Sequence, residues 1–200
     1  MPTFRRNFLI LLPLALLTAS LLFQGGADAE PKAEKTSAPQ LEPIELGITR
    51  NVHQFGPTLL CGQPDKAAFE KAQQEGIKVV VTLRKENEIN WDESKLVQDL
   101  GMEFHQLGFQ SPDSLSDEIL DKSRDLLRNS DKSPVMLHCG SANRVGAVWM
   151  AYRVLDEGID PQTALKEAQQ VGLRTPAYAA GVMDYIKRKE KMADTTGMAD

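Results

Sequence analysis

Residues 134–155 read PVMLHCGSANRVGAVWMAYRVL, and this stretch decides which fold the chain can form. Its apolar run at 135–137 is typical of a buried strand, and the long apolar run after Gly146 is typical of a buried helix. A loop of small residues lies between the two runs. A strand that enters a helix through such a loop points several backbone N–H groups at one place, where the helix dipole adds positive charge. The stretch therefore predicts an anion-binding loop between the last strand and a buried helix.

A cysteine and an arginine stand at the two ends of this loop. Arg144 has a planar guanidinium that can hold two oxygens of a tetrahedral anion, and the loop N–H groups would stabilise Cys139 as a thiolate. We therefore expect Cys139 to act as a nucleophile on a bound phosphorus or sulfur centre. The alternative is a buried structural cysteine with a surface arginine nearby. The four residues expected to wrap the anion are Gly140, Ser141, Ala142 and Asn143.

Apolar runs alternate with helical patterns along residues 44–191, which form the expected domain. This alternation predicts a single α/β domain with a mainly parallel central sheet flanked by helices. Strands are expected at 58–61, 77–84, 102–109 and 135–138. Helices are expected at 65–75, 94–100, 116–128, 145–155, 161–171 and 176–191.

The two ends of the chain differ from this domain in composition. Arg5 and Arg6, the apolar run at 8–23 and the small residues before position 30 predict an export signal, residues 1–29, that is cleaved after Ala29. The alternative is an N-terminal membrane anchor, although the run is shorter than the roughly 20 residues that span a bilayer. Residues 30–43 predict a disordered linker and residues 192–200 a flexible tail. We therefore expect a periplasmic or secreted protein that has no membrane contact after cleavage.

Charge and motif content limit the partners of the domain. The formal net charge of −5 argues against nucleic acid or an anionic membrane surface, although a local positive loop can still bind an anion. No cofactor motif is present, and none of His53, His105 and His138 has metal-ligand spacing to a cysteine. We therefore expect an oxyanion substrate and neither a cofactor nor a metal.

The chain has a second cysteine, Cys61. Outside the cytosol a pair of cysteines commonly forms a disulfide, and a reversible bond to Cys139 would protect that thiol from over-oxidation. The simpler interpretation, which we favour, is that Cys61 is a small buried apolar residue.

The segment HCGSANRVG, residues 138–146, resembles the active-site loop of cysteine-dependent dual-specificity phosphatases. Together with CGQP at 61–64 and VTLRKENE at 81–88, it is most similar to the bacterial beta-lactamase-hydrolase-like family with a protein phosphatase-like domain. The resemblance covers roughly residues 46–189. It implies that Cys139 is the nucleophile that forms a phosphocysteine, that Arg144 clamps the phosphate and stabilises the transition state, and that His138 orients the loop.

Two departures from the phosphatase pattern keep other functions open. Only four residues separate Cys139 from Arg144, where the phosphatase pattern has five, and this shorter loop is similar to that of rhodanese-like sulfurtransferases. Val145 also stands where many phosphatases have Ser or Thr, a role that Ser141 could take. We expect a phosphatase that acts on a phosphoprotein or a small phosphoester. The alternatives are a sulfurtransferase that uses a Cys139 persulfide and a non-catalytic oxyanion-binding module.

A phosphatase of this type needs a carboxylic acid beside the leaving oxygen. The resemblance places it in the segment QSPDSLSDE, where Asp113 is the candidate. Its alternative role is to cap the start of the following helix. Glu86 and Glu88 lie on another loop that could also reach the site.

Overall fold

The computed structural model describes residues 39–197. The expected export signal and most of the expected linker lie outside these residues, so those two predictions stay predictions. Within the described residues, no helix combines the length and the apolar character that crossing a bilayer requires.

The centre of the fold is a six-stranded sheet with the strand order β1-β2-β3-β6-β4-β5. Four neighbouring strands, β3, β6, β4 and β5, run parallel, whereas β1 and β2 join one edge as antiparallel strands. The expected α/β domain with a mainly parallel sheet is thus confirmed. The strands are β1 (Glu42–Pro43), β2 (His53–Phe55), β3 (Thr58–Cys61), β4 (Val79–Thr82), β5 (Glu103–Gln106) and β6 (Val135–His138).

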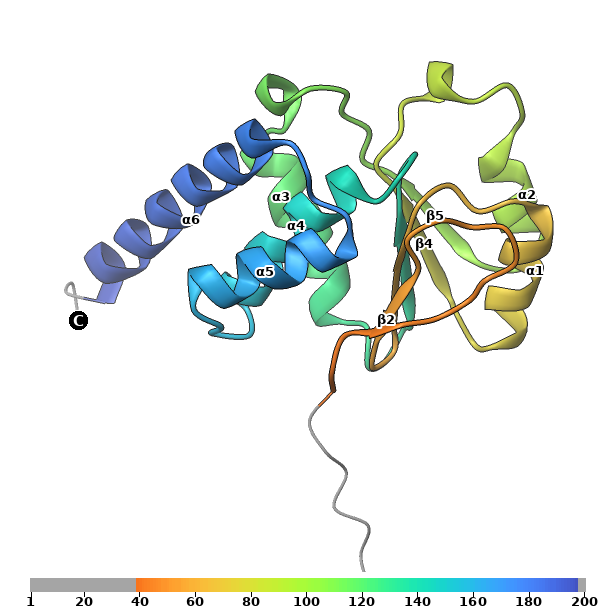
Figure 1. Ribbon diagram of the computed structural model, residues 1–200, viewed down its shortest axis with the longest axis horizontal. Helices are drawn as coiled ribbons and strands as arrows, with labels where there is room; N and C mark the ends of the chain where they lie inside the picture. The colour runs from red at the N-terminus through yellow and green to blue at the C-terminus, as the bar shows by residue number, and fades with distance from the viewer. Residues whose placement is uncertain (1–38, 198–200) are drawn as a thin grey trace, which may run out of the picture. The chain divides into compact units, whose positions relative to one another are not determined.

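Helices cover both faces of this sheet (Figure 1). One face carries α1 and α2, and the other carries α3, α4, α5 and α6. The bounds of the α-helices are α1 (Lys66–Gln74), α2 (Glu93–Asp99), α3 (Asp117–Arg128), α4 (Asn143–Leu155), α5 (Pro161–Val171) and α6 (Pro176–Gly197). Two single 3-10 turns, η1 (Glu86–Glu88) and η2 (Pro112–Ser114), lie in the loops after β4 and β5.

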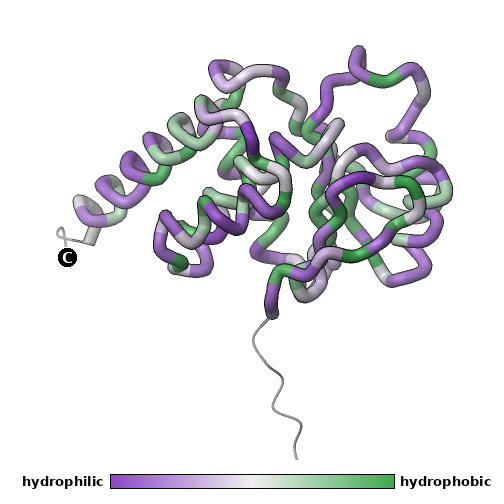
Figure 2. The backbone as a smooth tube through the Cα atoms, viewed as in Figure 1, coloured by the Kyte–Doolittle hydropathy of each residue, from purple (hydrophilic) through white to green (hydrophobic). Residues whose placement is uncertain are grey.

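Two hydrophobic cores follow from the alternation of side chains along the strands. Val81 and Leu137 pack into the core beneath α3–α6, while Val80 and Met136 pack into the core beneath α1 and α2. Figure 2 shows the result, with hydrophobic segments gathered along the central strands and hydrophilic segments on the outer helices. The buried helix expected after Gly146 is confirmed as α4, in which ten consecutive residues from Val145 to Val154 are buried.

The structure differs from the sequence-based expectations at both ends of the domain. The β1 strand lies at the end of the stretch expected to be linker, where it pairs with β2 of the expected domain. Neither strand was predicted, because two or three residues give no readable alternation. At the other end α6 continues to Gly197, through residues expected to form a loose tail. Alanine, methionine and lysine around residue 192 are good helix formers and let the helix continue.

Gly146 holds α4 against α5 and the segment that follows it. A Cβ atom at this position would lie 2.6 Å from the carbonyl oxygen of Ala168 and 2.8 Å from Cβ of Leu173. Both separations are far inside van der Waals contact, so only glycine allows this approach. The close packing sets the position of α4, and therefore of the loop that precedes it.

We predict that Gly146→Ala lowers the free energy of unfolding by about 1–3 kcal/mol, because the added methyl group must push backbone apart. Urea unfolding monitored by circular dichroism gives the measurement. The matched control is Gly181→Ala in α6, where a Cβ would have no neighbour within 4 Å. This control should be stabilised by about 0.5–1 kcal/mol through helix propensity. Equal effects of the two substitutions would contradict the proposed contact.

Candidate active site

The loop from Cys139 to Ala142 connects the carboxyl end of β6 to the start of α4. Because β6 lies between β3 and β4, the loop sits at the middle of the sheet edge where the parallel strands end. Ligands of α/β folds bind at this edge. Ala142 adopts a left-handed conformation with φ of 62°, which lets the chain turn sharply into the helix.

The amino end of α4 lacks the side-chain cap that four other helices have. The caps of α1, α2, α3 and α5 each accept a hydrogen bond from a first-turn amide, and their residues are Asp65, Asp92, Ser116 and Asp160. Ala142 stands at the corresponding position of α4 and makes no such bond. The hydrogen bond from the Gly146 amide to the Ala142 carbonyl, 2.9 Å long, begins the helical ladder. The three amides before Gly146 therefore remain available to an anion.

Donors outside the loop hold two of its carbonyl groups. The backbone N–H of Gln63 donates to the Gly140 carbonyl at 3.4 Å, and Asn51 Nδ2 donates to the Ser141 carbonyl at 3.0 Å. In a trans peptide the following N–H points opposite to the C=O. The Ser141 amide is thereby turned away from Gln63, which leaves it free to face a ligand.

Cys139 is a free thiol with 1% of its surface exposed. Its amide donates to the carbonyl of Cys61 at 3.3 Å, so the two cysteines are neighbours through the backbone. Cys61 is also free and packs in the core beneath α1 and α2, whereas Cys139 packs in the core beneath α3–α6. Burial, together with the nearby Cys139 and Glu93, raises the pKa of Cys61. Cys61 is therefore a buried, neutral thiol in this structure.

Arg144 is bound end-on by Glu88 of η1. Its Nη1 and Nη2 atoms donate to the two carboxylate oxygens of Glu88 at 2.8 and 2.7 Å. Nη1 also donates to the carbonyls of Leu83, at 2.8 Å, and Phe109, at 2.5 Å. These acceptors follow β4 and β5, so the guanidinium ties three adjacent loops together.

The pKa values of Glu88 and Arg144 are shifted in the directions that keep both side chains charged. Burial works against ionisation of Glu88, but hydrogen bonds from Arg144 and the Lys85 amide, and the charges of Arg144 and Arg84, lower its pKa. Burial also opposes the charge on Arg144, yet its pKa is raised by Glu88 and by Cys139, which lies against the guanidinium. The thiol and the guanidinium expected to cooperate are thus brought together.

The remaining edge of the guanidinium, formed by Nε and Nη2, is the part that an oxyanion can use. Within residues 39–197 no oxygen accepts a hydrogen bond from Nε of Arg144. Nη2 lies 3.8 Å from the position that a Cβ of Gly140 would take, so it lies against the loop. A guanidinium has five N–H donors, and Glu88 occupies the Nη1–Nη2 edge, which adjoins the Nε–Nη2 fork and leaves the second N–H of Nη2 to that fork. Glu88 therefore orients Arg144 without filling its anion-binding edge.

A chain of buried polar contacts links the two ends of the loop. His138 Nε2 lies 3.0 Å from Glu93, and both side chains are 2% exposed or less. Gln63 donates to Glu93 at 2.6 Å and accepts from Arg84 at 2.6 Å. Arg84 in turn donates to the carbonyl of Glu88, the partner of Arg144. The residue before Cys139 and the residue that closes the loop are thus connected through three other elements.

Two of the predicted substrate-binding residues use their side chains to anchor the loop. Ser141 Oγ accepts from Arg174 Nη2 at 2.5 Å, so this hydroxyl is engaged by the segment between α5 and α6. The Asn143 side chain accepts from the amides of Arg174 and Thr175 at 2.8 and 3.2 Å and donates to Thr175 Oγ1 at 2.9 Å. What these residues can offer an anion is therefore their backbone amides.

Asp113 lies on η2 with its side chain exposed. The η2 turn contacts α6 and follows Phe109, whose carbonyl accepts from Arg144. Asp113 is thus carried on a segment that adjoins the site, and its role as general acid stays a prediction. The other two candidate acids have different surroundings. Glu88 accepts hydrogen bonds from Arg144, whereas Glu86 is exposed.

Comparison with known proteins was made by sequence and by structure. No family model matches the chain. The dual specificity protein phosphatase TpbA of Pseudomonas aeruginosa is 28% identical over 162 residues, which cover 80% of this chain and 71% of TpbA. The chain is thus a homologue of TpbA.

Solved structures of TpbA and of two other proteins have the same fold as this chain. The crystal structure of TpbA has a TM-score of 0.58 and 22% identity over 77% of this chain and 92% of that one. A DUF442 protein from Shewanella putrefaciens has a TM-score of 0.60 and 22% identity over 72% and 95% of the two chains. PTPMT1 gives 0.59 and 19% over 69% and 94%. These three structures show the shared fold. The similarity in sequence to TpbA confirms the expected resemblance to the dual-specificity phosphatases and supports a phosphoric monoester hydrolase.

The described residues contain no group of three or more His, Cys, Asp or Glu side chains suited to hold a metal ion. The site is built instead from one thiol, one guanidinium and backbone amides. Several residues that support it were not predicted as site residues, namely Asn51, Gln63, Glu93 and Arg174. Two sequence motifs could have pointed to part of this support, namely GQP at 62–64 and LR at 83–84. Both follow strands that end at the sheet edge where the site lies.

We predict that Glu93→Gln lowers the free energy of unfolding at pH 7 by about 1–3 kcal/mol, because a buried charge-assisted contact is lost. Burial alone would raise the pKa of Glu93, but hydrogen bonds and charge from His138, with further bonds from Gln63 and Thr82, lower it. A lowered folded-state pKa stabilises the protein above about pH 4.3, the usual value for glutamate, and this stabilisation is lost as the pH falls further.

The difference between Glu93→Gln and the parent should therefore shrink below about pH 4.3 in urea unfolding measured across pH. Glu190→Gln, on an exposed part of α6, is the matched control and should stay within about 0.5 kcal/mol of the parent. A Glu93→Gln difference that grows toward acid pH would show that Glu93 is not ionised in the folded protein.

Proposed function

We propose that this homologue is an exported, cysteine-dependent phosphatase that hydrolyses phosphoesters through a cysteinyl-phosphate intermediate. The observation that carries the proposal is the fork of Arg144, held open by Glu88 beside Cys139 and the uncapped end of α4. These groups supply what phosphoryl transfer needs, which is a nucleophile and fixed donors for the charged equatorial oxygens.

In the proposed reaction the Cys139 thiolate attacks phosphorus in line with the leaving oxygen. The S–P bond forms as the P–O bond to the leaving group breaks, and Asp113 gives its proton to the departing oxygen. Arg144 and the loop amides hold the other phosphoryl oxygens throughout. Water then attacks phosphorus, loses a proton to the Asp113 carboxylate, and releases inorganic phosphate and the thiolate.

Two further parts of the proposal rest on the sequence and on a relative. Export is supported by the signal pattern at residues 1–29. A cysteine-to-serine variant of TpbA has been solved in complex with pTyr, which supports a phosphotyrosine-containing protein as a substrate for this homologue. The net charge of −5 is compatible with such a substrate because the local donors are concentrated at one loop.

We predict that Cys139→Ser and Arg144→Lys each reduce the kcat/KM for p-nitrophenyl phosphate by at least about a hundredfold. Serine at this position is not ionised, and lysine keeps the charge but lacks the fork. Arg188→Lys, an exposed arginine on α6, is the matched control and should keep the parental rate.

The same preparations should be tested for sulfur transfer from thiosulfate to cyanide. Thiocyanate formation that disappears in Cys139→Ser, without phosphate release by the parent, would establish the sulfurtransferase alternative. Phosphate binding with neither turnover would establish the non-catalytic module.

We predict that Asp113→Asn removes the basic limb of the pH–rate profile for kcat, because no proton is left to titrate on the acid. The loss of rate should be larger for phenyl phosphate, whose leaving group is poor, than for p-nitrophenyl phosphate. Glu86→Gln, at an exposed position on η1, is the matched control and should retain both limbs. A basic limb that persists in Asp113→Asn assigns the proton donor to another group.

A further inference from the structure

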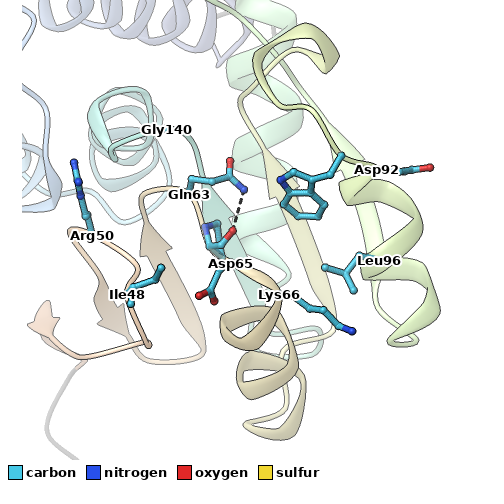
Figure 3. Close-up of a pocket in the computed structure, with 10 residues that line it drawn as sticks. Ile48, Arg50, Gln63, Asp65, Lys66, Asp92, Leu96 and Gly140 are labelled. Atoms are coloured by element: carbon cyan, nitrogen blue, oxygen red, sulfur yellow. Dashed lines mark hydrogen bonds between the residues drawn. The ribbon is translucent and has the colours of Figure 1, made fainter.

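A cleft of about 790 Å³ adjoins the catalytic loop on the side of α1 and α2 (Figure 3). It reaches the loop at Gly140, next to Cys139, and at Gln63, whose amide donates to the Gly140 carbonyl. Its size is that of a site for a drug-sized ligand and exceeds the needs of one phosphate group. The lining residues are Ile48, Arg50, Gln63, Pro64, Asp65, Lys66, Trp91, Asp92, Leu96 and Gly140.

Exposed apolar side chains are concentrated in this cleft. Large apolar side chains that are exposed within the described residues are Ile48 at 81%, Trp91 at 38% and Met192 at 62%, and the first two line the cleft. Ile48 and Trp91 lie far apart in the sequence, and the fold brings both to the wall of this cleft. Exposed apolar groups that line one cleft mark a surface that a partner covers.

The Trp91 wall of the cleft is supported by the core. The Trp91 ring packs edge-on against Phe69, with ring centres 6.3 Å apart. Phe69 is fully buried and also packs against His138, the residue before the nucleophile, with ring centres 5.7 Å apart. The same buried ring therefore supports the wall of the cleft and the base of the catalytic loop, so their relative position is fixed.

One charged group in the cleft, Arg50, can bind an anionic partner beside the apolar one. Asp65 and Asp92 each cap a helix through a 2.8 Å hydrogen bond, and Lys66 lies 3.7 Å from Glu70. Arg50 is exposed and makes no ion pair within residues 39–197. The cleft thus has a cation without a protein counterion.

The backbone presents Arg50 at the catalytic loop. Its carbonyl accepts from the Gly62 amide at 2.8 Å. The next residue, Asn51, takes a left-handed conformation with φ of 51° and donates to the Ser141 carbonyl. The segment is thus fastened to Gly62 and to the catalytic loop, and Arg50 lines the same cleft as Gly140.

We propose that this cleft binds the residues next to the phosphorylated residue of a protein substrate, with an apolar side chain between Ile48 and Trp91 and an acidic side chain on Arg50. The inference rests on the proposed phosphatase function and assigns the binding site for the residues beside the phosphorylated one. A neighbouring residue of an extended peptide lies about 3.3–3.6 Å further along the chain, so a segment with its phosphate at Cys139 continues into the cleft. An anionic lipid surface would also offer apolar and negatively charged groups, but the net charge of −5 of this chain disfavours binding to it.

The test uses the purified protein and three phosphotyrosine peptides. The peptides carry Leu and Glu, Gly only, or Leu and Lys on both sides of the phosphotyrosine, and p-nitrophenyl phosphate serves as the substrate that has no flanks. The readout is kcat/KM for a peptide divided by kcat/KM for p-nitrophenyl phosphate, because this ratio cancels differences in the amount of folded enzyme. The parent should prefer the Leu and Glu peptide over the Gly peptide.

Ile48→Ala and Trp91→Ala should each lower the ratio for the Leu and Glu peptide by about tenfold, the effect expected for one lost apolar contact. Met192→Ala removes an exposed apolar side chain outside the cleft and is the matched control. Arg50→Glu should reverse the preference between the Glu and Lys peptides, while Lys132→Glu, another exposed cation, should not. Unchanged ratios in Ile48→Ala and Trp91→Ala would overturn the proposal.

Two further measurements separate this proposal from its alternatives. If the cleft variants lose turnover of phosphatidylinositol phosphate vesicles and keep their peptide ratios, the cleft binds lipid and the proposal is wrong. Titration of Cys139→Ser with the Leu and Glu phosphopeptide should change Trp91 fluorescence, against a constant background from the fully buried Trp149. If the protein binds the peptide but the parent turns over no substrate, the phosphatase function is wrong and the cleft proposal is supported. If the parent turns over p-nitrophenyl phosphate but no peptide binds, the phosphatase function is supported and the cleft proposal is wrong.

Discussion

The pairing of Arg144 with Glu88 is the interaction on which the site depends. It fixes one edge of the guanidinium against a carboxylate and two carbonyls, and it leaves the other edge directed at the loop. A free arginine side chain would lose conformational entropy each time a substrate bound. Here that entropy is lost on folding, so the donors are in place before the oxyanion arrives.

The loop combines this fixed arginine with a helix end that the protein leaves uncapped. Capping the first turn of α4 with a side chain would stabilise the helix by about 0.5–2 kcal/mol. Ala142 has no side-chain acceptor and cannot supply this stabilisation. The left-handed conformation of Ala142 adds a further cost that glycine would avoid. Both features are unfavourable for folding alone. They become understandable if the amides are kept for a bound anion.

The sequence predicted the parallel strands and the helices well because most of them lie next to Gly, Pro or a capping residue and carry a clear apolar pattern. It also located the candidate site loop between β6 and α4, since Cys139 and Arg144 are close in sequence. It did not predict the partners of the loop. Glu88 lies 56 positions from Arg144, and Gln63 lies 30 positions from Glu93, so only the folded sheet edge brings them together. The β1–β2 pairing was missed because its strands are too short to show a pattern.

Hydrogen bonds between Asn143 and the residues Arg174 and Thr175 join the end of the Cys139 loop to the segment between α5 and α6. A ribosome-bound chain that has not yet extended past Thr175 lacks these contacts, even if its whole sheet has formed. Order in the loop is therefore linked to synthesis of the segment between α5 and α6. For the exported phosphatase proposed above, this would delay assembly of the Cys139 site until that segment has left the ribosome.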